Sequence, residues 1–284
     1  MVLAKQQFDP TDVRQLKQTF AALGKPNNYK QFGQNFLIDP ALRDSILAAA
    51  ALVSSDTVLE IGPGSGVLTQ KLVECVGRVV AIDIDPYLLE VTRLACQGAN
   101  NLELRLEDVR KINLPKLFGQ KEYVLVSNVP YYLSGYLLEL FTETPNSPKR
   151  MVLTLQREVA ERIVAGPGEQ SILSIAIALF GRAKLMQVVS RSAFWPEPKV
   201  DSAVLVIERH VQPIVLAAQK KPLMRVVKAG FSAKRKKLAN ALAGGLHLEV
   251  VEVRERLKQA GLDPNIRAQE LTLKDWALLS QKFK

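Results

Sequence analysis

Short runs of β-branched and aliphatic residues alternate along the first two thirds of the chain with longer segments of helical periodicity. The apolar runs predict strands at residues 57–61, 79–84, 102–106, 123–127, 151–155, 185–189 and 203–208. The intervening segments predict helices at residues 40–53, 66–76, 86–97, 135–142, 156–164 and 171–180. Strands and helices that alternate in this way indicate an α/β fold with a mainly parallel sheet covered on both faces.

The pattern changes toward the C-terminus. No convincing helix separates the last two predicted strands, so we expect them to form an antiparallel pair at one edge of the sheet. After residue 210 only helical periodicity remains, which predicts helices at residues 223–231, 234–242, 250–259 and 273–282. We therefore expect an N-terminal extension over residues 1–29, an α/β domain over residues 30–210 and a small all-helical domain over residues 211–284.

The composition is that of a packed soluble protein. Hydrophobic residues make up 48% of the chain and charged residues 23%, which argues against disorder, collagen and coiled coil. The longest apolar run, residues 46–53, is far shorter than the roughly 18 residues that span a bilayer. The first ten residues lack the apolar core of a signal peptide, and Cys75 and Cys96 form neither a disulfide framework nor a metal-ligand cluster. We expect a cytoplasmic protein that engages no membrane and binds no metal.

Positive charge is concentrated in the last third of the chain. The formal net charge is +10, yet residues 1–198 hold 21 basic and 20 acidic side chains, whereas residues 199–284 hold 17 and 8. Every charged side chain between residues 211 and 248 is basic: Lys220, Lys221, Arg225, Lys228, Lys234, Arg235, Lys236 and Lys237. Such an excess is typical of a surface that contacts nucleic acid, although a solvated helix face produces the same pattern.

A glycine-rich turn follows the first of the predicted strands. Gly62, Gly64 and Gly66 come directly after a strand that contains Glu60, and a helix is expected to follow them. Glycine permits a tight turn and the close approach of backbone to a ligand. The G-x-G-x-G spacing differs from the G-x-G-x-x-G of dinucleotide sites, and Pro63 and the acidic Glu60 also argue against a pyrophosphate site. A plain strand–helix turn is the alternative interpretation.

Acidic residues end the next two predicted strands. Asp83 lies about 20 residues after the glycine turn, where an acid accepts hydrogen bonds from ribose hydroxyls, and Asp85 is a nearby alternative. Asp108 follows the strand at residues 102–106 and is suited to an adenine amino group, although it could equally cap a helix. These positions favour a nucleoside cofactor without phosphates over a dinucleotide.

Asn128, Val129, Pro130 and Tyr131 follow the fourth predicted strand. This quartet suits methylation of an exocyclic amine, which needs acceptors that hold the amine while its lone pair leaves conjugation with the base. The Asn128 side-chain oxygen and the Val129 carbonyl are the candidate acceptors. Pro130 stiffens the turn, and Tyr131 offers a face for a base or for a nearby cation. An ordinary turn with a core tyrosine is the alternative, which the position downstream of the glycine turn disfavours.

With these motifs the chain resembles the bacterial small-subunit ribosomal RNA adenine dimethyltransferase family, relatives of the erythromycin-resistance methylases. The matching segments lie at residues 32–37, 60–64, 128–131, 193–204 and 231–238, and so span nearly the whole chain. The resemblance implies a seven-stranded, Rossmann-like sheet of the S-adenosylmethionine-dependent methyltransferase type with a small all-helical C-terminal domain.

The resemblance also implies roles for individual residues. S-adenosylmethionine would be bound by Asn35, Leu37, Glu60, Gly62, Gly64, Asp83, Asp108 and Asn128. Within this set, Gly62 is assigned to the methionine end, and Asn128 contacts both the cofactor and the target amine. Phe194 would flank the target base opposite Tyr131, and the RNA would be contacted by Lys234, Arg235, Lys236 and Lys237.

The chain departs from the family pattern at several positions. The family usually has Glu in place of Asp83, Leu in place of Val129 and Asn in place of Tyr132. The first two changes are conservative, whereas Tyr132 alters the expected shape of the pocket. Ser171 and Ile172 stand where the family often shows Tyr-Gly, a change for which we have no account.

The implied activity is methyl transfer to the N6 amines of two adjacent adenosines in the 3′-terminal loop of small-subunit (16S) ribosomal RNA. The expected partner is the small ribosomal subunit or its RNA and not DNA, and the enzyme is expected to be a monomer that contributes to subunit biogenesis. Three alternatives remain: a macrolide-resistance methylase of large-subunit RNA, a non-catalytic ribosome-assembly factor and a DNA adenine methyltransferase. Residues 199–203 and 231–238 favour the small-subunit assignment. A DNA enzyme would usually carry Pro at position 129 and a target-recognition domain.

Overall fold

The structure, a computed structural model, describes residues 8–24, 34–233 and 235–283. The contacts divide the chain into two compact units. The α/β unit comprises Met1–Ala160 with Lys184–Glu208, and the helical unit comprises Glu161–Ala183 with Arg209–Lys284. This division differs from the expected domain limits, which assign residues 161–183 to the α/β domain. They group with the C-terminal helices because Ile175 and Leu179 belong to the hydrophobic cluster of that unit.

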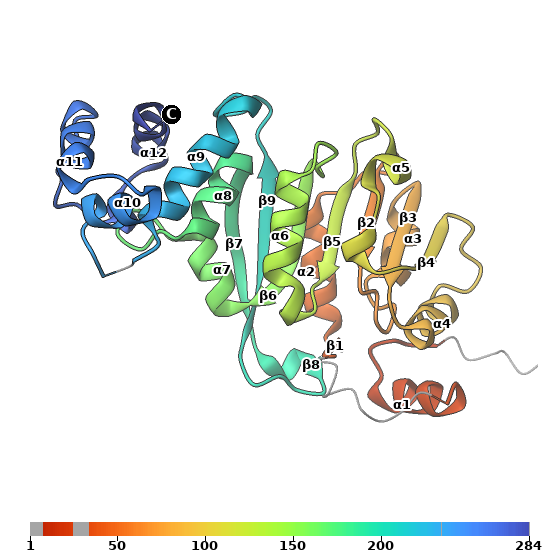
Figure 1. Ribbon diagram of the computed structural model, residues 1–284. Coiled ribbons are helices and arrows are strands. Elements are labelled where there is room, and N and C mark those ends of the chain that lie inside the picture. The colour runs from red at the N-terminus through yellow and green to blue at the C-terminus, as the bar shows by residue number, and fades with distance from the viewer. Residues whose placement is uncertain (1–7, 25–33, 234, 284) are drawn as a thin grey trace, which may run out of the picture. The chain divides into compact units, whose positions relative to one another are not determined.

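A seven-stranded sheet forms the framework of the fold, with the strand order β4-β3-β2-β5-β6-β9-β7 (Figure 1). The strands are β2 Thr57–Ile61, β3 Arg78–Asp83, β4 Leu102–Leu106, β5 Val124–Asn128, β6 Arg150–Gln156, β7 Gly181–Val189 and β9 Ser202–Arg209. Strands β2 to β6 are parallel, and β9 runs antiparallel to β6. The predicted fold class is therefore confirmed, with β9 and β7 as neighbours at one edge.

Helices cover the sheet on both sides, and in Figure 1 α6 lies in front of the strands and α2 behind them. The helices of the α/β unit are α1 Val13–Ala22, α2 Pro40–Ala50, α3 Thr69–Cys75, α4 Pro86–Ala95, α5 Leu114–Phe118 and α6 Ser134–Glu143, and α7 Arg157–Val164 continues into the helical unit. Val58 packs against α2 and α3 in one hydrophobic cluster, while its neighbour Leu59 points to the opposite face and is equally buried. Burial of both faces explains why central strands such as β2 consist of nearly continuous apolar runs, whereas β7, at the edge of the sheet, alternates exposed and more buried residues.

The sequence pattern missed a small antiparallel sheet formed by β1 Phe36–Leu37 and β8 Phe194–Trp195. Two-residue strands carry no periodicity, so only the tertiary structure reveals them. Phe36 also packs in a hydrophobic cluster with Leu16 and Phe20 of α1. This cluster holds the segment around residues 34–37 at the edge of the α/β unit that carries the candidate site.

The helical unit packs around a fully buried tryptophan, Trp276, whose ring stacks on Phe231 at a centroid distance of 5.8 Å. Its further helices are α8 Ile172–Phe180, α9 Ala217–Gly230, α10 Leu238–Leu246, α11 Val250–Gln259 and α12 Leu273–Lys282. The predicted start of α10 at residue 234 was wrong by four residues, because the helix begins at Leu238. The basic residues 235–237 precede the helix, since the positive end of the helix dipole disfavours cations in the first turn. Within the residues described in both units, no helix is long and apolar enough to cross a membrane.

Candidate active site

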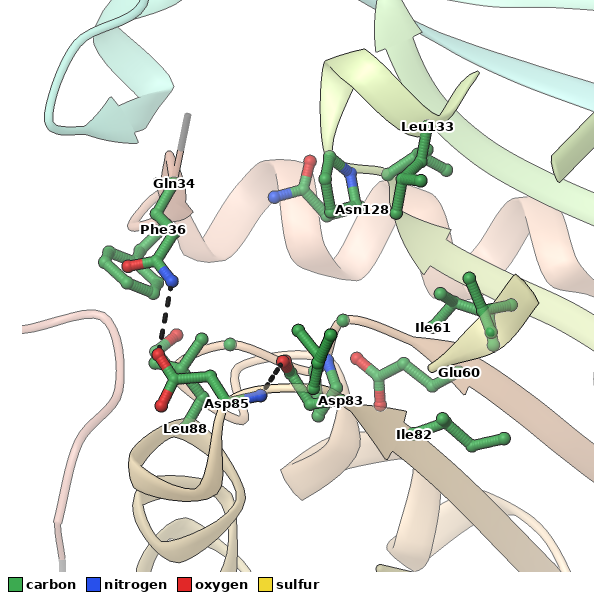
Figure 2. A pocket seen from close by; sticks show the side chains of 18 of the residues that line it. Gln34, Phe36, Glu60, Ile61, Ile82, Asp83, Asp85, Leu88, Asn128 and Leu133 are labelled. Carbon is green, nitrogen blue, oxygen red and sulfur yellow. Dashed lines mark hydrogen bonds between the residues drawn. The ribbon is translucent and has the colours of Figure 1, made fainter. Parts of the chain in front are cut away.

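A cavity of about 540 Å³ opens at the carboxyl ends of the parallel strands. The predicted site residues that line it are Asn35, Leu37, Glu60, Gly62, Gly64, Asp83, Asp108, Asn128, Val129, Pro130 and Tyr131. They come from β1 and from the ends of β2, β3, β4 and β5, which converge because parallel strands end at one edge of the sheet. Figure 2 shows Asn128 across this space from Glu60 and Asp83. The structure thus brings together residues that lie as far apart as positions 35 and 131.

The glycine turn adopts the left-handed backbone region at all three of its glycines, with φ values of +68°, +61° and +79° at Gly62, Gly64 and Gly66. Gly62 and Gly64 line the cavity, and a Cβ on Gly64 would lie 3.3 Å from the Phe36 ring. Gly66 serves a different purpose: a Cβ there would lie 2.8 Å from the Cβ of Ala95 in α4. Two glycines therefore shape the cavity, and the third allows helix packing.

Glu60 is a buried carboxyl group in the wall of the cavity. It lies inside β2, is 1% exposed, and its Oε2 accepts a 2.7 Å hydrogen bond from the hydroxyl of Thr69. The pKa of Glu60 is raised to about 8, chiefly by burial and to a smaller extent by the nearby Asp83 carboxylate, whereas the hydrogen bond from Thr69 opposes the shift. At neutral pH the Glu60 side chain is therefore mainly protonated in this structure.

The two predicted nucleoside-binding acids occupy successive strand ends. Asp83 ends β3, and its Oδ1 accepts a 2.9 Å hydrogen bond from the backbone N–H of Asp85. Asp108 caps a short 3₁₀ helix at Val109–Lys111 and pairs with Arg110, with Oδ2 2.6 Å from Nη2. Hydrogen bonds from Arg110 lower the pKa of Asp108 to about 2. Asp108 is therefore both a helix cap and an ionised acceptor at the cavity wall.

Hydrogen bonds to neighbouring segments hold the turn after β5 in place. The Nδ2 of Asn128 donates to the carbonyl oxygen of Asn35 at 3.1 Å, which leaves its Oδ1 as the end of the amide that can accept. The N–H of Val129 donates to the carbonyl oxygen of Thr154 in β6 at 3.2 Å. The hydroxyl of Tyr131 lies 2.6 Å from that of Ser202 in β9. Burial raises the pKa of Tyr131, so its hydroxyl stays neutral at physiological pH.

Several predicted site residues do not line the cavity. Phe194 is 3% exposed, pairs with Leu37 across β1 and β8, and packs in the cluster that also contains α2. Arg235, Lys236 and Lys237 are exposed in the helical unit, between α9 and α10. Lys234 lies outside the described residues. The roles of these residues toward a base and toward RNA remain predictions.

The sequence-based interpretation also missed residues that line the cavity. The Oγ of Ser65 and the Oε1 of Gln34 are buried in its wall, and neither has a hydrogen-bond partner among the described residues. Tyr132, already noted in the sequence as a departure that alters the pocket, lines the same cavity, and 70% of it is exposed. Both Gln34 and Ser65 lie within glycine-containing motifs, but only the folded chain shows that their polar atoms are buried and unpaired. Buried polar atoms of this kind require a partner.

Solved structures of similar fold agree with this architecture. A dimethyladenosine transferase from Plasmodium falciparum matches with a TM-score of 0.73 at 29% identity, covering 85% of this chain and 94% of that chain. A 23S rRNA methyltransferase, ErmE, matches with a TM-score of 0.72 at 24% identity, covering 87% and 99%, and supports the fold alone. The fold is that of the Rossmann-like, S-adenosylmethionine-dependent methyltransferases.

The particular family follows from the sequence comparisons. The family model described as ribosomal RNA adenine dimethylase matches residues 25–284. The ribosomal RNA small subunit methyltransferase A of Dehalococcoides mccartyi is 37% identical over 255 residues, which cover 89% of this chain and 88% of that protein. That of Desulfitobacterium hafniense is 38% identical over 260 residues, covering 91% and 93%. The chain belongs to the ribosomal RNA adenine dimethylase family, and the resemblance expected from its motifs is confirmed.

Proposed function

We propose that this protein transfers methyl groups from S-adenosylmethionine to the N6 amines of two adjacent adenosines near the 3′ end of small-subunit ribosomal RNA. The observation that carries the proposal is the cavity, which places the glycine turn, Asp83, Asp108 and the Asn128 turn around one space. Membership of the family and the small-subunit activity of relatives that match most of the chain support the choice of substrate.

The residues present fit a nucleoside cofactor with an amino-acid end. A volume of about 540 Å³ lies within the range of roughly 300–1,000 Å³ that is common for small-molecule sites. Asp83 and Asp108 would accept from the ribose hydroxyls and the adenine amino group. The unpaired Ser65 Oγ and Gln34 Oε1 supply polar atoms that a bound ligand would satisfy. When bound, the cofactor supplies an electrophilic methyl group on a positively charged sulfur.

The residues of the Asn128 turn would hold the target amine. Asn128 Oδ1 and the Val129 carbonyl oxygen would accept hydrogen bonds from the N6 amine, so that its lone pair is released from conjugation with the adenine ring. Pro130 and the hydrogen bond from the Leu133 N–H to the Pro130 carbonyl oxygen, at 2.8 Å, keep this turn rigid. The ring of Tyr131 would stack on the base. Orientation of the two reactants is then the main contribution of the protein to the rate.

The helical unit would supply affinity for RNA. Its charged residues between positions 211 and 248 are all basic, and Arg235, Lys236 and Lys237 are exposed. Cations of this kind bind phosphates with little dependence on sequence and with a strong dependence on salt. Recognition of the ribosomal RNA would therefore combine an electrostatic contribution from this unit with the base pocket of the α/β unit.

The proposal is tested with labelled cofactor and undermethylated small ribosomal subunits. The expected result is incorporation of label as N6,N6-dimethyladenosine at two adjacent positions, mapped by primer extension. Label found instead in large-subunit RNA would assign the chain to the resistance methylases. Binding of subunits without incorporation of label would indicate a non-catalytic assembly factor.

A further inference from the structure

The segment Lys199–Val204 carries part of the family resemblance, yet the site described above gives its residues no function beyond the contact between Ser202 and Tyr131. Ser202, the first residue of β9, is completely buried. Its Oγ lies 2.6 Å from the hydroxyl of Tyr131, and the two residues are 71 positions apart in the sequence. This contact links an otherwise unassigned motif to the ring expected to stack on the target base.

The register of the sheet explains how the contact arises. Asn128 of β5 pairs with Thr154 of β6, and Thr154 pairs with Val204 of β9. Ser202 lies two residues beyond Val204, toward the edge at which the cavity opens, and pairs with Gln156. Strands β5 and β9 are about 10 Å apart, since β6 lies between them. The side chain of Tyr131 must therefore extend across the end of β6, and its hydroxyl is the atom that reaches Ser202.

Asp201 fixes the strand end from which Ser202 projects. Its carbonyl oxygen accepts a 3.0 Å hydrogen bond from the N–H of Arg157, the residue that follows β6. Its carboxylate Oδ1 accepts a 3.3 Å hydrogen bond from the N–H of Arg191, in the segment that leads into Phe194. Asp201 thus holds the start of β9 to two neighbouring segments, and Ser202 is the next residue. Tyr131 is fixed at its backbone by the turn after β5 and at its hydroxyl by Ser202.

We propose that Ser202 is a positioning residue for methyl transfer, which fixes the Tyr131 ring at the angle required for stacking of the target adenine. This inference rests on the proposed function. A ring anchored only at its backbone would sample other angles and allow the base to enter in unproductive orientations. The second methylation would suffer most, because an amine that already carries a methyl group leaves less room for error. The hydroxyl of Tyr131 then acts in orientation and takes no part in proton transfer.

The inference is tested with the variants Ser202→Ala, Tyr131→Phe and the double variant, in the labelled assay on undermethylated subunits. Each single change removes the same hydrogen bond and is expected to lower kcat about tenfold, with the KM for RNA changed less than about twofold. The double variant is expected to be no slower than the slower single variant, because one interaction cannot be lost twice. The ratio of N6-methyladenosine to N6,N6-dimethyladenosine should rise in all three, while the Kd for the cofactor stays unchanged.

A matched control is Ser280→Ala, which removes another buried serine hydroxyl, one that donates to the Ala277 carbonyl oxygen in α12. This variant should retain the wild-type rate and product ratio. Multiplicative losses in the double variant, or an unchanged product ratio in the single variants, would overturn the inference. If Ser202→Ala does not fold, Tyr131→Phe breaks the bond from the other side, and wild-type kcat in that variant would also overturn it. Failure of the wild-type protein to incorporate label would count against the proposed function instead.

Discussion

The α/β unit buries some of its ionisable side chains, whereas the described ionisable side chains of the helical unit remain in contact with water. The α/β unit buries Glu60 and also Asp56, whose Oδ1 lies 2.6 Å from the Nζ of Lys149. Among the described residues of the helical unit, the buried polar groups are uncharged and include the hydroxyls of Ser174 and Ser280 and the indole Nε1 of Trp276. Desolvated groups act strongly over short distances, whereas solvated cations act over longer distances and are screened by salt. This contrast supports the proposal that the α/β unit carries out the chemistry and that the helical unit supplies affinity for RNA.

The largest expected effect comes from Asn128→Ala in the α/β unit. The change removes the amide oxygen that would accept from the target amine, and loss of one such contact costs about 100-fold or more in rate. Methyl transfer should fall by this amount while the affinity for RNA, measured by filter binding, stays within about twofold of the wild type. An equal loss of RNA affinity would contradict the division of roles between the units.

The second prediction removes charge from the helical unit. Replacing Arg235, Lys236 and Lys237 with Gln should weaken RNA binding by about tenfold or more at low salt. The slope of log K against log salt should become shallower by about two to three, because three phosphate contacts are lost. The control carries the same charge change on α11 and α12, at the exposed residues Arg254, Lys258 and Lys274. If both triple variants lose the same affinity, net charge and not this surface determines binding. Affinity for the cofactor should be unchanged in both.

The same comparison explains what could be predicted from the sequence. Asp83, Asp108 and Asn128 were placed correctly at the cavity because the ends of parallel strands converge and local patterns reveal those ends. The contact between Tyr131 and Ser202 could not be predicted, since it depends on the register of β5, β6 and β9. By composition alone Phe194 is more often a core residue, and it is indeed buried, but its pairing with Leu37 between two-residue strands could not be predicted.

In the helical unit the periodicity located the helices but not all of their limits. The prediction of a helix from residue 223 misses the start of α9, which begins at Ala217 and continues through Pro222. The protonation state of Glu60 likewise could not be predicted from the sequence. A carboxyl group next to a glycine turn looks like a charged ligand contact until its burial is known.

A pH titration sharpens the contrast between buried and solvated carboxyl groups. The folded state keeps Glu60 protonated up to about pH 8, whereas the unfolded chain loses this proton near pH 4.5. Because the folded state binds more protons between these values, this group lowers the free energy of unfolding as pH rises through that window. In Glu60→Gln this pH dependence is absent, and the Thr69 hydroxyl can still donate to the amide oxygen.

The measurement is urea unfolding of wild type and Glu60→Gln from pH 4 to 9. The variant should gain stability relative to wild type between about pH 4.5 and 8, and the difference should be constant above that range. The control is Glu255→Gln on α11, an exposed carboxylate paired with Lys258, whose stability curve should run parallel to that of the wild type. Parallel curves for Glu60→Gln as well would mean that Glu60 is ionised in the folded protein.

The smallest expected effects are the changes in stability caused by alanine at two adjacent glycines of α10, Gly244 and Gly245. A Cβ at Gly245 would lie 2.7 Å from both the Cα and the Cβ of Ala229 in α9, whereas a Cβ at Gly244 meets no atom within 4 Å. Gly245→Ala should therefore destabilise the helical unit by about 1–3 kcal/mol through overpacking. Gly244→Ala should stabilise it by up to about 1 kcal/mol, because alanine favours the helix. If the two variants shift the unfolding midpoint in opposite directions, Gly245 and not Gly244 lies at the contact between α9 and α10. Shifts of the same sign would contradict this packing. Cofactor affinity should be unchanged in both variants, since the described residues that line the cavity belong to the α/β unit.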